Sequence, residues 1–225
     1  MILVKICGIT NWPDAKAACE AGANVLGFNF YEKSLRRVST ADAAQIRAKL
    51  PSEVESAGIF VNAPAADILS LRGFVSFRIA QLHGDETPET VSRVAAVAPV
   101  VKALHVGKDF AISRFDGYAD VFAFLLDAPH AGQYGGTGKT ADWAAAERAA
   151  RSHRIILSGG LKAENVGDAI RAVRPYGVDV ASGVEVKPGK KDHGRMAEFV
   201  QEVRRAEREL ELDVASDGAG ELDRI

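Results

Sequence analysis

Leu3-Val4-Lys5-Ile6-Cys7-Gly8-Ile9-Thr10-Asn11, near the start of the chain, is the first of several similar stretches and shows how the chain is built. Its opening residues form a short apolar run typical of a β-strand, and Gly8 allows a sharp turn. Thr10 or Asn11 can cap a helix whose first turn contains Pro13. The stretch therefore predicts a strand, a turn and a helix, with the Cys7 thiol at the carboxyl end of the strand, where α/β folds place their chemistry.

The same order of elements repeats along the chain. Apolar runs predict strands near residues 3–7, 25–30, 57–61, 78–81, 99–102, 121–126, 154–157 and 177–181. Amphipathic, Ala-rich stretches predict helices near residues 12–21, 40–50, 64–72, 87–97, 109–115, 140–150, 163–172 and 192–210. This alternation predicts right-handed βα units and a parallel sheet. Eight units in 225 residues fit a closed (β/α)8 TIM barrel, typically of about 250 residues, better than the alternative, an open doubly wound sheet.

Composition indicates one soluble domain, because 47% of the residues are hydrophobic and 26% are charged. Residues 207–225 contain seven acids against two arginines, so we expect an acidic tail that is frayed or disordered. The net charge of the chain is −2, which leaves +3 on the barrel domain, residues 1–206. A mildly positive domain suits a small anionic ligand, and no cluster of Lys and Arg among aromatic residues indicates nucleic-acid binding.

The two cysteines, Cys7 and Cys19, are too few for a disulfide framework, which favours a reducing, cytoplasmic location. No signal-peptide pattern and no run of about 20 apolar residues occurs, so we expect neither export nor membrane insertion. The five histidines show no metal-site spacing, and we expect no metal.

Two glycine-containing loops predict a phosphate site. Gly159 and Gly160 follow the seventh predicted strand, and Ser182 and Gly183 follow the eighth. Glycine lets backbone N–H groups approach an anion, and barrels often bind phosphate on these two loops. The alternative for each loop is an ordinary tight turn.

Two strand ends present candidates for proton transfer. Lys5 and Cys7 alternate onto one face of the first strand, and a nearby ammonium group lowers a thiol pKa toward the range of a general base. Asp127 follows an apolar strand, where partial burial would suit a proton donor. A buried cysteine without a role and an aspartate that caps a helix are the alternatives. Gln81 and His83 share a face of the fourth strand, as ligand contacts or as structural residues.

A further glycine-rich stretch covers residues 132–140. It lacks the spacing of a nucleotide-binding P-loop, because Gln133 stands where the first glycine is required. We interpret this stretch as a lid over the site or as a surface loop.

Together these motifs closely resemble phosphoribosylanthranilate isomerase of tryptophan biosynthesis. The resemblance runs in order from about residue 2 to 205, and its most specific parts are Lys5-Ile6-Cys7-Gly8-Ile9-Thr10 and Gln81-Leu82-His83-Gly84. Its other parts lie at residues 27–30, 34–38, 58–62, 126–127, 135–138, 157–161 and 179–185. The chain departs from the family pattern at Leu35, where proline is common, and at Ser158, where alanine occurs. Neither departure removes a reacting group.

The resemblance implies a TIM-barrel enzyme that carries out a cofactor-free Amadori rearrangement, an aldose–ketose isomerisation, by acid/base catalysis. Cys7 would be the base and Asp127 the acid. Arg36, rather than its neighbour Arg37, would hold the anthranilate carboxylate, and Asp179 would contact a sugar hydroxyl or the pair Lys5 and Cys7. The partner would be a small phosphosugar.

Three alternatives remain for the activity: a sister barrel acting on another phosphosugar, a phosphosugar sensor without catalysis, and a nucleotide-binding module. The metal ligands or multiple lysines of the sister barrels are missing, and retention of Cys7 and Asp127 argues against a sensor. The P-loop spacing excludes the nucleotide-binding module. No second phosphate loop occurs in the first half of the chain, which argues against activity on the related histidine-pathway aminoaldose. The sequence allows a monomer or a homodimer.

Overall fold

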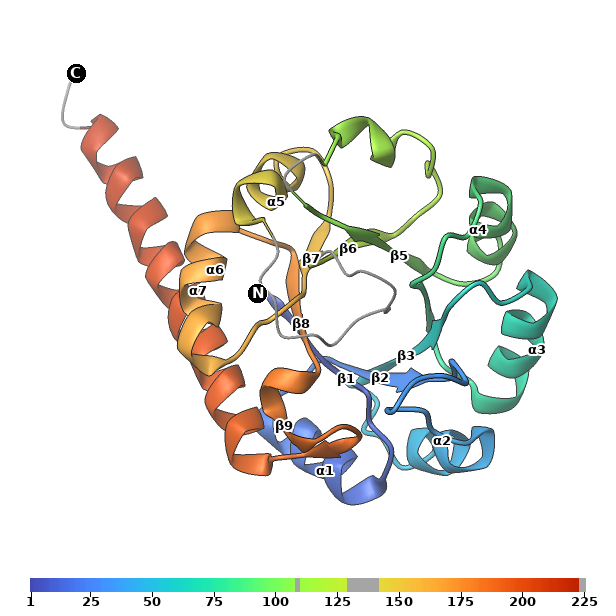
Figure 1. Ribbon diagram of the computed structural model, residues 1–225. Helices are drawn as coiled ribbons and strands as arrows, with labels where there is room; N and C mark the ends of the chain where they lie inside the picture. Colours follow the sequence, from blue (N-terminus) through green and yellow to red (C-terminus); the bar gives the residue numbers. More distant parts are fainter. Residues whose placement is uncertain (108–109, 129–141, 223–225) are drawn as a thin grey trace.

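Eight parallel strands close into a barrel with helices around it, as seen in the computed structural model in Figure 1. The structure describes residues 1–107, 110–128 and 142–222, with side chains to residue 212. The strands are β1 (Leu3–Cys7), β2 (Val25–Asn29), β3 (Glu55–Phe60), β4 (Ile79–Leu82), β5 (Val100–His105), β6 (Ala123–Asp127), β7 (Ile155–Leu157) and β8 (Gly177–Val180). Closure is completed by β1, whose Lys5 pairs with Val25 of β2 and with Asp179 of β8. The predicted barrel is confirmed, and the open sheet is wrong.

The α-helices lie outside the barrel and begin where capping residues predict them. Asn11, Ser39, Thr87 and Asp142 each accept a hydrogen bond from a backbone N–H group of the first turn that they precede. The helices are α1 (Trp12–Ala21), α2 (Thr40–Arg47), α3 (Ala65–Val75), α4 (Pro88–Ala95), α5 (Trp143–Ala150), α6 (Ala163–Val173) and α7 (His193–Leu222). No helix in the described part of the chain is long and apolar enough to cross a membrane.

The helix predicted over residues 109–115 is wrong. Residue 109 lies outside the described residues, and the rest of the segment contains only a short 3-10 helix, η1 (Ile112–Phe115). Phe115 is buried against Phe124, with ring centroids 4.6 Å apart, and the ring of His153 stacks on it at 4.5 Å. One anchored aromatic ring therefore covers this part of the barrel where a whole helix was expected.

Two short strands were not predicted from the sequence. After β8 and the 3-10 helix η2 (Ser182–Val184), the chain forms an antiparallel pair, β9 (Glu185–Lys187) and β10 (Lys190–Lys191). Gly189 lies in the connection between them with a φ of 77°, a value that favours glycine. The pair brings Lys191 back to the barrel mouth.

The last helix extends further than the predicted residue 210, to Leu222. Glu207 accepts a hydrogen bond from the backbone N–H group of Ile2, and Leu210 packs against the core. The fraying predicted for residues 207–225 stays a prediction.

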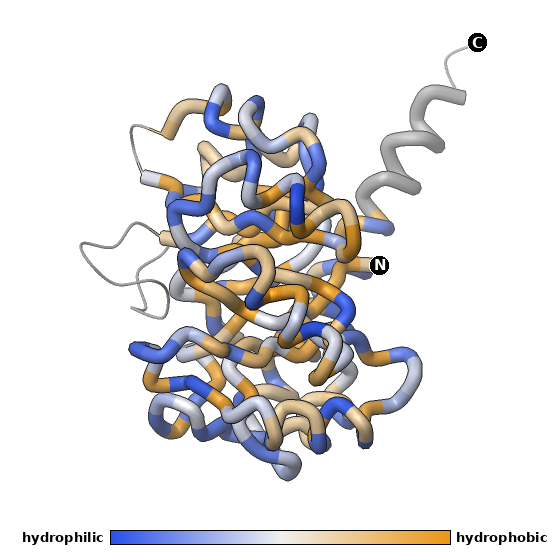
Figure 2. The backbone as a smooth tube through the Cα atoms, turned by 90° about the vertical axis from the view of Figure 1, so that its right-hand side faces the viewer, coloured by the Kyte–Doolittle hydropathy of each residue, from blue (hydrophilic) through white to orange (hydrophobic). Residues whose placement is uncertain are grey.

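The core has two parts, and hydrophobic residues concentrate along the strands and the inner faces of the helices (Figure 2). A large cluster fills the space between strands and helices, and a small one fills the barrel interior. Ala123 and Leu125 of β6 belong to the inner cluster. Since side chains alternate along a strand, Asp127 two residues later also faces inward, at the carboxyl end. The fold thus places polar strand-end residues above an apolar interior.

Candidate active site

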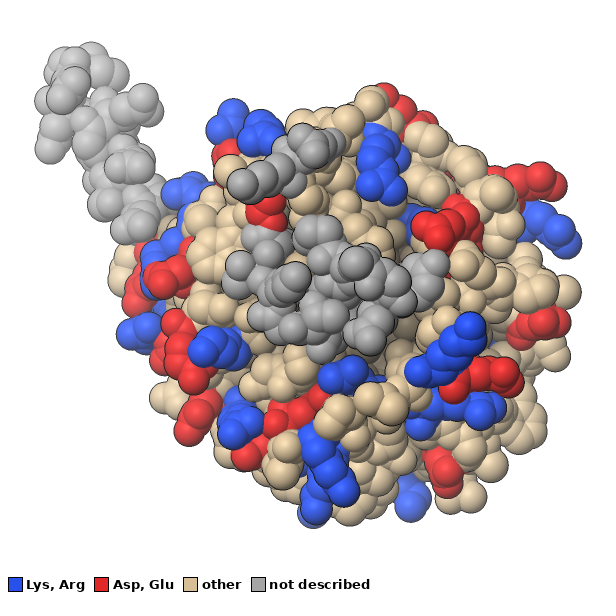
Figure 3. Space-filling view, in the orientation of Figure 1, with Lys and Arg blue, Asp and Glu red and all other residues tan. Residues whose placement is uncertain are grey.

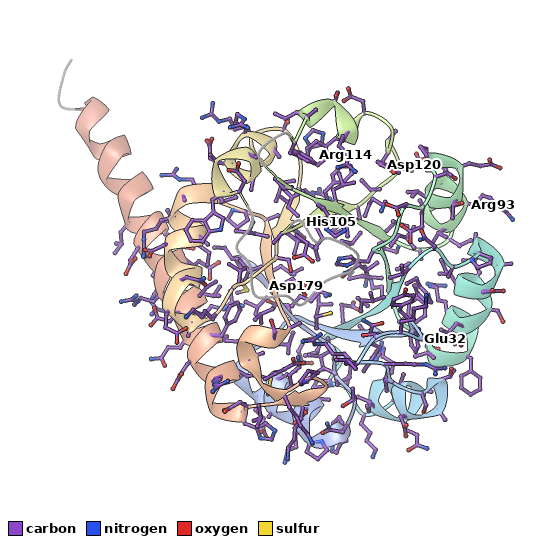
Figure 4. All side chains as sticks on the ribbon, viewed as in Figure 1. Glu32, Arg93, His105, Arg114, Asp120 and Asp179 are labelled. Carbon is purple, nitrogen blue, oxygen red and sulfur yellow. The ribbon has the colours of Figure 1, made fainter. Side chains whose placement is uncertain are left out.

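A pocket lies at the carboxyl ends of the strands, and the catalytic and substrate-contact residues predicted from the sequence line it together. They are Cys7, Arg36, Gln81, His83, Asp127 and Asp179. Figure 4 places Asp179 near the centre of the barrel, while Glu32, Arg93 and Asp120 lie toward the rim. On the face seen in Figure 1, Lys and Arg are interspersed with Asp and Glu (Figure 3).

The β1–β8 side of the pocket holds Cys7 above a buried ion pair. Lys5 Nζ donates to Asp179 Oδ1 at 2.5 Å, and both side chains are almost fully buried. Ser158 Oγ donates to the other carboxylate oxygen of Asp179 at 3.1 Å. Gly27 of β2 makes room for the thiol, since a Cβ atom there would lie 3.0 Å from Cys7 Sγ. Asp179 therefore contacts Lys5, one of the partners predicted for it.

Burial outweighs the lowering effect that Lys5 was predicted to have on the pKa of the Cys7 thiol. Burial raises the pKa of Cys7 above its ordinary value, and the Lys5 ammonium group offsets only part of that rise. Asp179 acts in the same direction as burial. Burial alone would lower the pKa of Lys5, but Asp179 raises it, so Lys5 stays charged as part of a neutral pair. The prediction that Lys5 brings the thiol pKa down to the working range is wrong.

Arg36 reaches the pocket from the loop after β2 and is held by a carboxylate that the site predictions did not include. Arg36 Nε donates to Glu185 Oε1 at 3.0 Å and Arg36 Nη2 donates to Glu185 Oε2 at 2.8 Å. This two-point contact fixes the plane of the guanidinium group. Arg37 does not line the pocket; its side chain is half exposed and its nearest carboxylate partner is Glu32, at 4.0 Å.

Lys191 of β10 completes this cluster from below. Its side chain is fully buried, and its Nζ donates to the carbonyl oxygens of Cys7 at 2.5 Å and Ala181 at 3.2 Å and to Glu185 Oε1 at 3.0 Å. Sequence reasoning missed this residue because it belongs to a short basic run that resembles a solvated surface. Only the return of β10 to the barrel reveals it, whereas Glu185 stood in a motif quoted for the family resemblance.

Asp127 lies at the end of β6 and faces His83, which follows β4. Its Oδ1 accepts a hydrogen bond from the N–H group of Ala128 at 2.8 Å, and its Oδ2 lies 3.3 Å from His83 Nε2. The side-chain nitrogen of Gln81 lies 2.9 Å from His83 Nδ1. If that amide donates, His83 carries its proton on Nε2, toward Asp127. Gln81, His83 and Asp127 thus lie next to one another along the pocket wall.

The loops predicted to hold phosphate follow β7 and β8, and their glycines are sterically required. Gly159 and Gly160 adopt φ values of 81° and 65°. A Cβ atom on Gly159 would lie 2.9 Å from Asp127 Oδ1, and one on Gly183 would lie 2.0 Å from the carbonyl oxygen of Leu161. Gly159 therefore also makes room for Asp127. Ser182 begins η2, beside Gly183.

Within residues 1–107, 110–128 and 142–222, no group of three His, Cys, Asp or Glu side chains could hold a metal ion. The lid predicted at residues 132–140 lies outside the described residues.

Comparison with known proteins decides the family. The family model "N-(5'phosphoribosyl)anthranilate (PRA) isomerase" matches residues 4–202. The chain belongs to this family. N-(5'-phosphoribosyl)anthranilate isomerases from Pelobacter propionicus and Thermotoga maritima are 47% and 44% identical to it, over 89% of this chain and 95% and 98% of theirs. A crystal structure of such an isomerase with reduced 1-(o-carboxyphenylamino)-1-deoxyribulose 5-phosphate is 40% identical. It superposes with a TM-score of 0.82, covering 91% of this chain and 99% of that one.

Membership in this family makes the chain an aldose–ketose isomerase, formally an intramolecular oxidoreductase, of tryptophan biosynthesis. The sister-barrel, sensor and nucleotide-binding alternatives are therefore wrong. A related Thermotoga maritima structure, 41% identical with a TM-score of 0.81 over 91% of this chain and 99% of that one, is described as monomers made from a dimeric isomerase.

Proposed function

We propose that this isomerase converts N-(5-phosphoribosyl)anthranilate into 1-(2-carboxyphenylamino)-1-deoxyribulose 5-phosphate with Cys7 as general base and Asp127 as general acid. The observation that supports these roles is that both side chains line one pocket from opposite sides of the barrel mouth, on β1 and β6. An aldose–ketose isomerisation needs one group to give a proton and one to take a proton.

The first step opens the sugar ring. Asp127 gives its proton to the ring oxygen while the anthranilate nitrogen lone pair forms a double bond to C1, and the bond between C1 and the ring oxygen breaks. Oδ1 of Asp127 is held by the Ala128 N–H group, and Oδ2 faces His83 and the pocket. We assign the transferred proton to Oδ2.

The second step moves the double bond. The Cys7 thiolate takes the proton from C2, and the electrons of that C–H bond form an enolamine between C1 and C2. The enolamine then tautomerises: the C2 hydroxyl becomes a ketone and C1 gains a proton. The reaction is a net isomerisation, and we expect it to need no cofactor.

Arg36 is the proposed contact of the anthranilate carboxylate. Glu185 holds its guanidinium group at the edge of the pocket, and a planar fork of N–H donors suits a carboxylate. Gly159, Gly160, Ser182 and Gly183 are the proposed phosphate contacts, because their loops sit at the barrel end where such sites occur. Gln81, His83 and Asp179 are proposed contacts of the sugar, with Lys5 supporting Cys7 from below.

The substrate is a small molecule. We further propose a cytoplasmic location and a monomer or a homodimer, without nucleic-acid or membrane partners. The sequence favours this through its two free cysteines and the absence of a basic aromatic patch.

A fluorescence assay tests the function. Phosphoribosylanthranilate is generated in the cuvette, and the loss of its fluorescence is followed with and without the protein. The proposal expects decay to accelerate in proportion to protein concentration, and an unchanged decay would refute it.

A further inference from the structure

The cluster of Arg36, Glu185 and Lys191 contains two cations for one carboxylate. Arg36 alone gives Glu185 a two-point partner, so Lys191 is not needed to neutralise it. Yet the Lys191 side chain is fully buried, and burying an ammonium group is unfavourable unless its hydrogen bonds and charge are used. The position of Lys191 therefore calls for an explanation beyond pairing with Glu185.

The other fully enclosed lysines of the described chain show the contrast. Lys5 is paired with Asp179, and Lys102 is paired with Glu86, each cation with one carboxylate. At Lys191 the balance leaves one positive charge in excess, next to the residue assigned as the base and to the residue assigned to the substrate carboxylate. In the proposed reaction Cys7 is negatively charged as a thiolate, and Arg36 binds the negatively charged carboxylate of the substrate.

The hydrogen bonds of Lys191 link the two parts of the site. All three N–H donors of an ammonium group are used, one on the carbonyl oxygen of Cys7, one on that of Ala181 and one on Glu185. The backbone of Lys191 is also fixed, because its N–H group donates to Asp14 Oδ2 at 2.9 Å. A continuous path thus runs from Arg36 through Glu185 and Lys191 to Cys7.

We infer that Lys191 is a positioning residue for the isomerase reaction, whose buried ammonium group fixes Cys7 and Arg36 relative to each other and supplies the positive charge that a Cys7 thiolate requires. This inference rests on the proposed roles of Cys7 and Arg36. It deepens them by naming the group that couples carboxylate recognition to the base.

The charges around the thiol agree with this role. Cys7 faces Lys5 from its own strand, Asp179 from β8 and Lys191 from β10, with Glu185 and Arg36 behind Lys191 and with His83 and Asp127 across the pocket. Burial raises the pKa of Cys7, and Lys191 acts against that rise together with Lys5. Asp179 offsets part of the effect of Lys5, and Lys191 adds a further, smaller effect in the same direction as Lys5.

The test measures the pH dependence of Cys7 alkylation by iodoacetamide together with kcat and KM. All variants are made in a Cys19→Ser background, so that Cys7 is the sole thiol. Lys191→Met removes the charge and the hydrogen bonds. Lys191→Gln removes the charge but keeps two N–H donors on a shorter side chain, and it serves if the methionine variant does not fold. Lys102→Met is the matched control, because Lys102 is equally buried and also paired with a glutamate.

We expect both Lys191 variants to shift the alkylation midpoint to higher pH by about one unit, which corresponds to about tenfold less thiolate near neutral pH. We also expect kcat to fall by about tenfold, more than KM rises. Lys102→Met should lower the melting temperature but leave the alkylation profile and kcat unchanged. If the effect of the Lys191 variants came only from general destabilisation, Lys102→Met would change the alkylation profile and kcat as well.

An unchanged alkylation profile and kcat in a folded Lys191 variant would overturn the inference, and so would an equal shift in Lys102→Met. Cys7→Ser in the same background separates this result from the proposed function. If Cys7→Ser keeps normal turnover, the role of Cys7 itself is wrong; if it loses turnover while the Lys191 variants do not, only the inference about Lys191 fails.

Discussion

Each side of the barrel mouth contains a buried lysine paired with a glutamate, yet the two pairs differ in what surrounds them. Lys102 of β5 donates to Glu86 Oε2 at 3.0 Å and to the carbonyl oxygens of Gly84 at 2.7 Å and Ala103 at 3.0 Å. Glu86 Oε1 in turn accepts from the N–H groups of Asn62 and Gly84. This pair holds together the loops that follow β3 and β4. It lies behind the strands, since Lys102 alternates with the inward-facing Val101 and Ala103.

Lys191 and Glu185 on the other side hold loops together as well, but they also contact Arg36 and Cys7, which line the pocket. The comparison shows that the role of a buried ion pair at a barrel mouth depends on the groups around it. A balanced pair that contacts loop backbone and the Tyr118 ring outside the pocket stabilises loops, whereas an excess charge beside the proposed reacting groups shapes the chemistry of the site.

Loss of a reacting group should have the largest effect. Cys7→Ser and Asp127→Asn should each lower kcat by about 10²- to 10⁴-fold, the range for removal of a positioned acid or base. The fluorescence assay with purified, folded variants measures this loss. A rate within about threefold of wild type for either variant would remove that residue from the mechanism.

Breaking the pair on the loop side should mainly affect stability. Lys102→Met leaves Glu86 buried without its cation, and removal of one partner of a buried pair costs about 3–5 kcal/mol in the free energy of unfolding. Urea denaturation gives this value. The double variant Lys102→Met/Glu86→Leu serves as the control and should recover part of the stability. If the single variant instead lost turnover while its stability stayed normal, the distinction between the two pairs would be wrong.

On the pocket side, Arg36 should matter for binding and its neighbour should not. Arg36→Ala removes a charged hydrogen-bond donor worth about 1.5–3 kcal/mol, so KM should rise about 10- to 100-fold. Arg37→Ala, a change to a half-exposed side chain outside the pocket, should keep KM within about twofold. Steady-state kinetics of the two variants decide the assignment, and the reverse pattern would move the carboxylate site by one residue.

A carboxylate on the outer helix α7 gives the smallest effect. Burial alone would raise the pKa of Glu207, but hydrogen bonds from the Ile2 N–H group and Arg204 outweigh burial and hold it below its ordinary value. Its contribution to stability is therefore present above the unfolded-state pKa and is lost as pH falls through the folded-state pKa. Glu207→Gln should reduce the free energy of unfolding by about 1 kcal/mol at about pH 7.

At acidic pH the difference in the free energy of unfolding between Glu207→Gln and wild type should be smaller than at about pH 7. Urea denaturation at both pH values checks this, and a difference that grows on acidification would contradict the sign of the shift.

Much of the architecture could be predicted from periodicity, because the strands are compact apolar runs and several helices begin at a capping residue, as at Asn11 and Asp142. The segment around Phe115 could not. Its conformation depends on packing against Phe124 and His153, which lie far away in the sequence. The pair β9 and β10 was missed for a related reason, since strands of two or three residues have no measurable period.

The lining of the pocket was predictable where a polar residue stands at or near a strand end, as at Cys7, Asp127 and Asp179. What could not be predicted is which charges meet. Lys5 acts on Cys7 and pairs with Asp179, as expected, but the sequence did not show that burial outweighs the effect of Lys5 on the thiol pKa. Lys191 reaches Cys7 from 184 residues away, a contact that no local pattern contains.

The division of the reaction between Cys7 and Asp127 is tested most directly by a deuterium isotope effect at C2 of the sugar. Single-turnover measurements separate the chemical steps from product release. Substrate deuterated at C2 should react more slowly than ordinary substrate with Cys7→Ser, because removal of that hydrogen limits the rate. With Asp127→Asn the difference should nearly vanish, because ring opening then comes first and is slow. A full isotope effect in Asp127→Asn together with none in Cys7→Ser would contradict the assignment of base and acid.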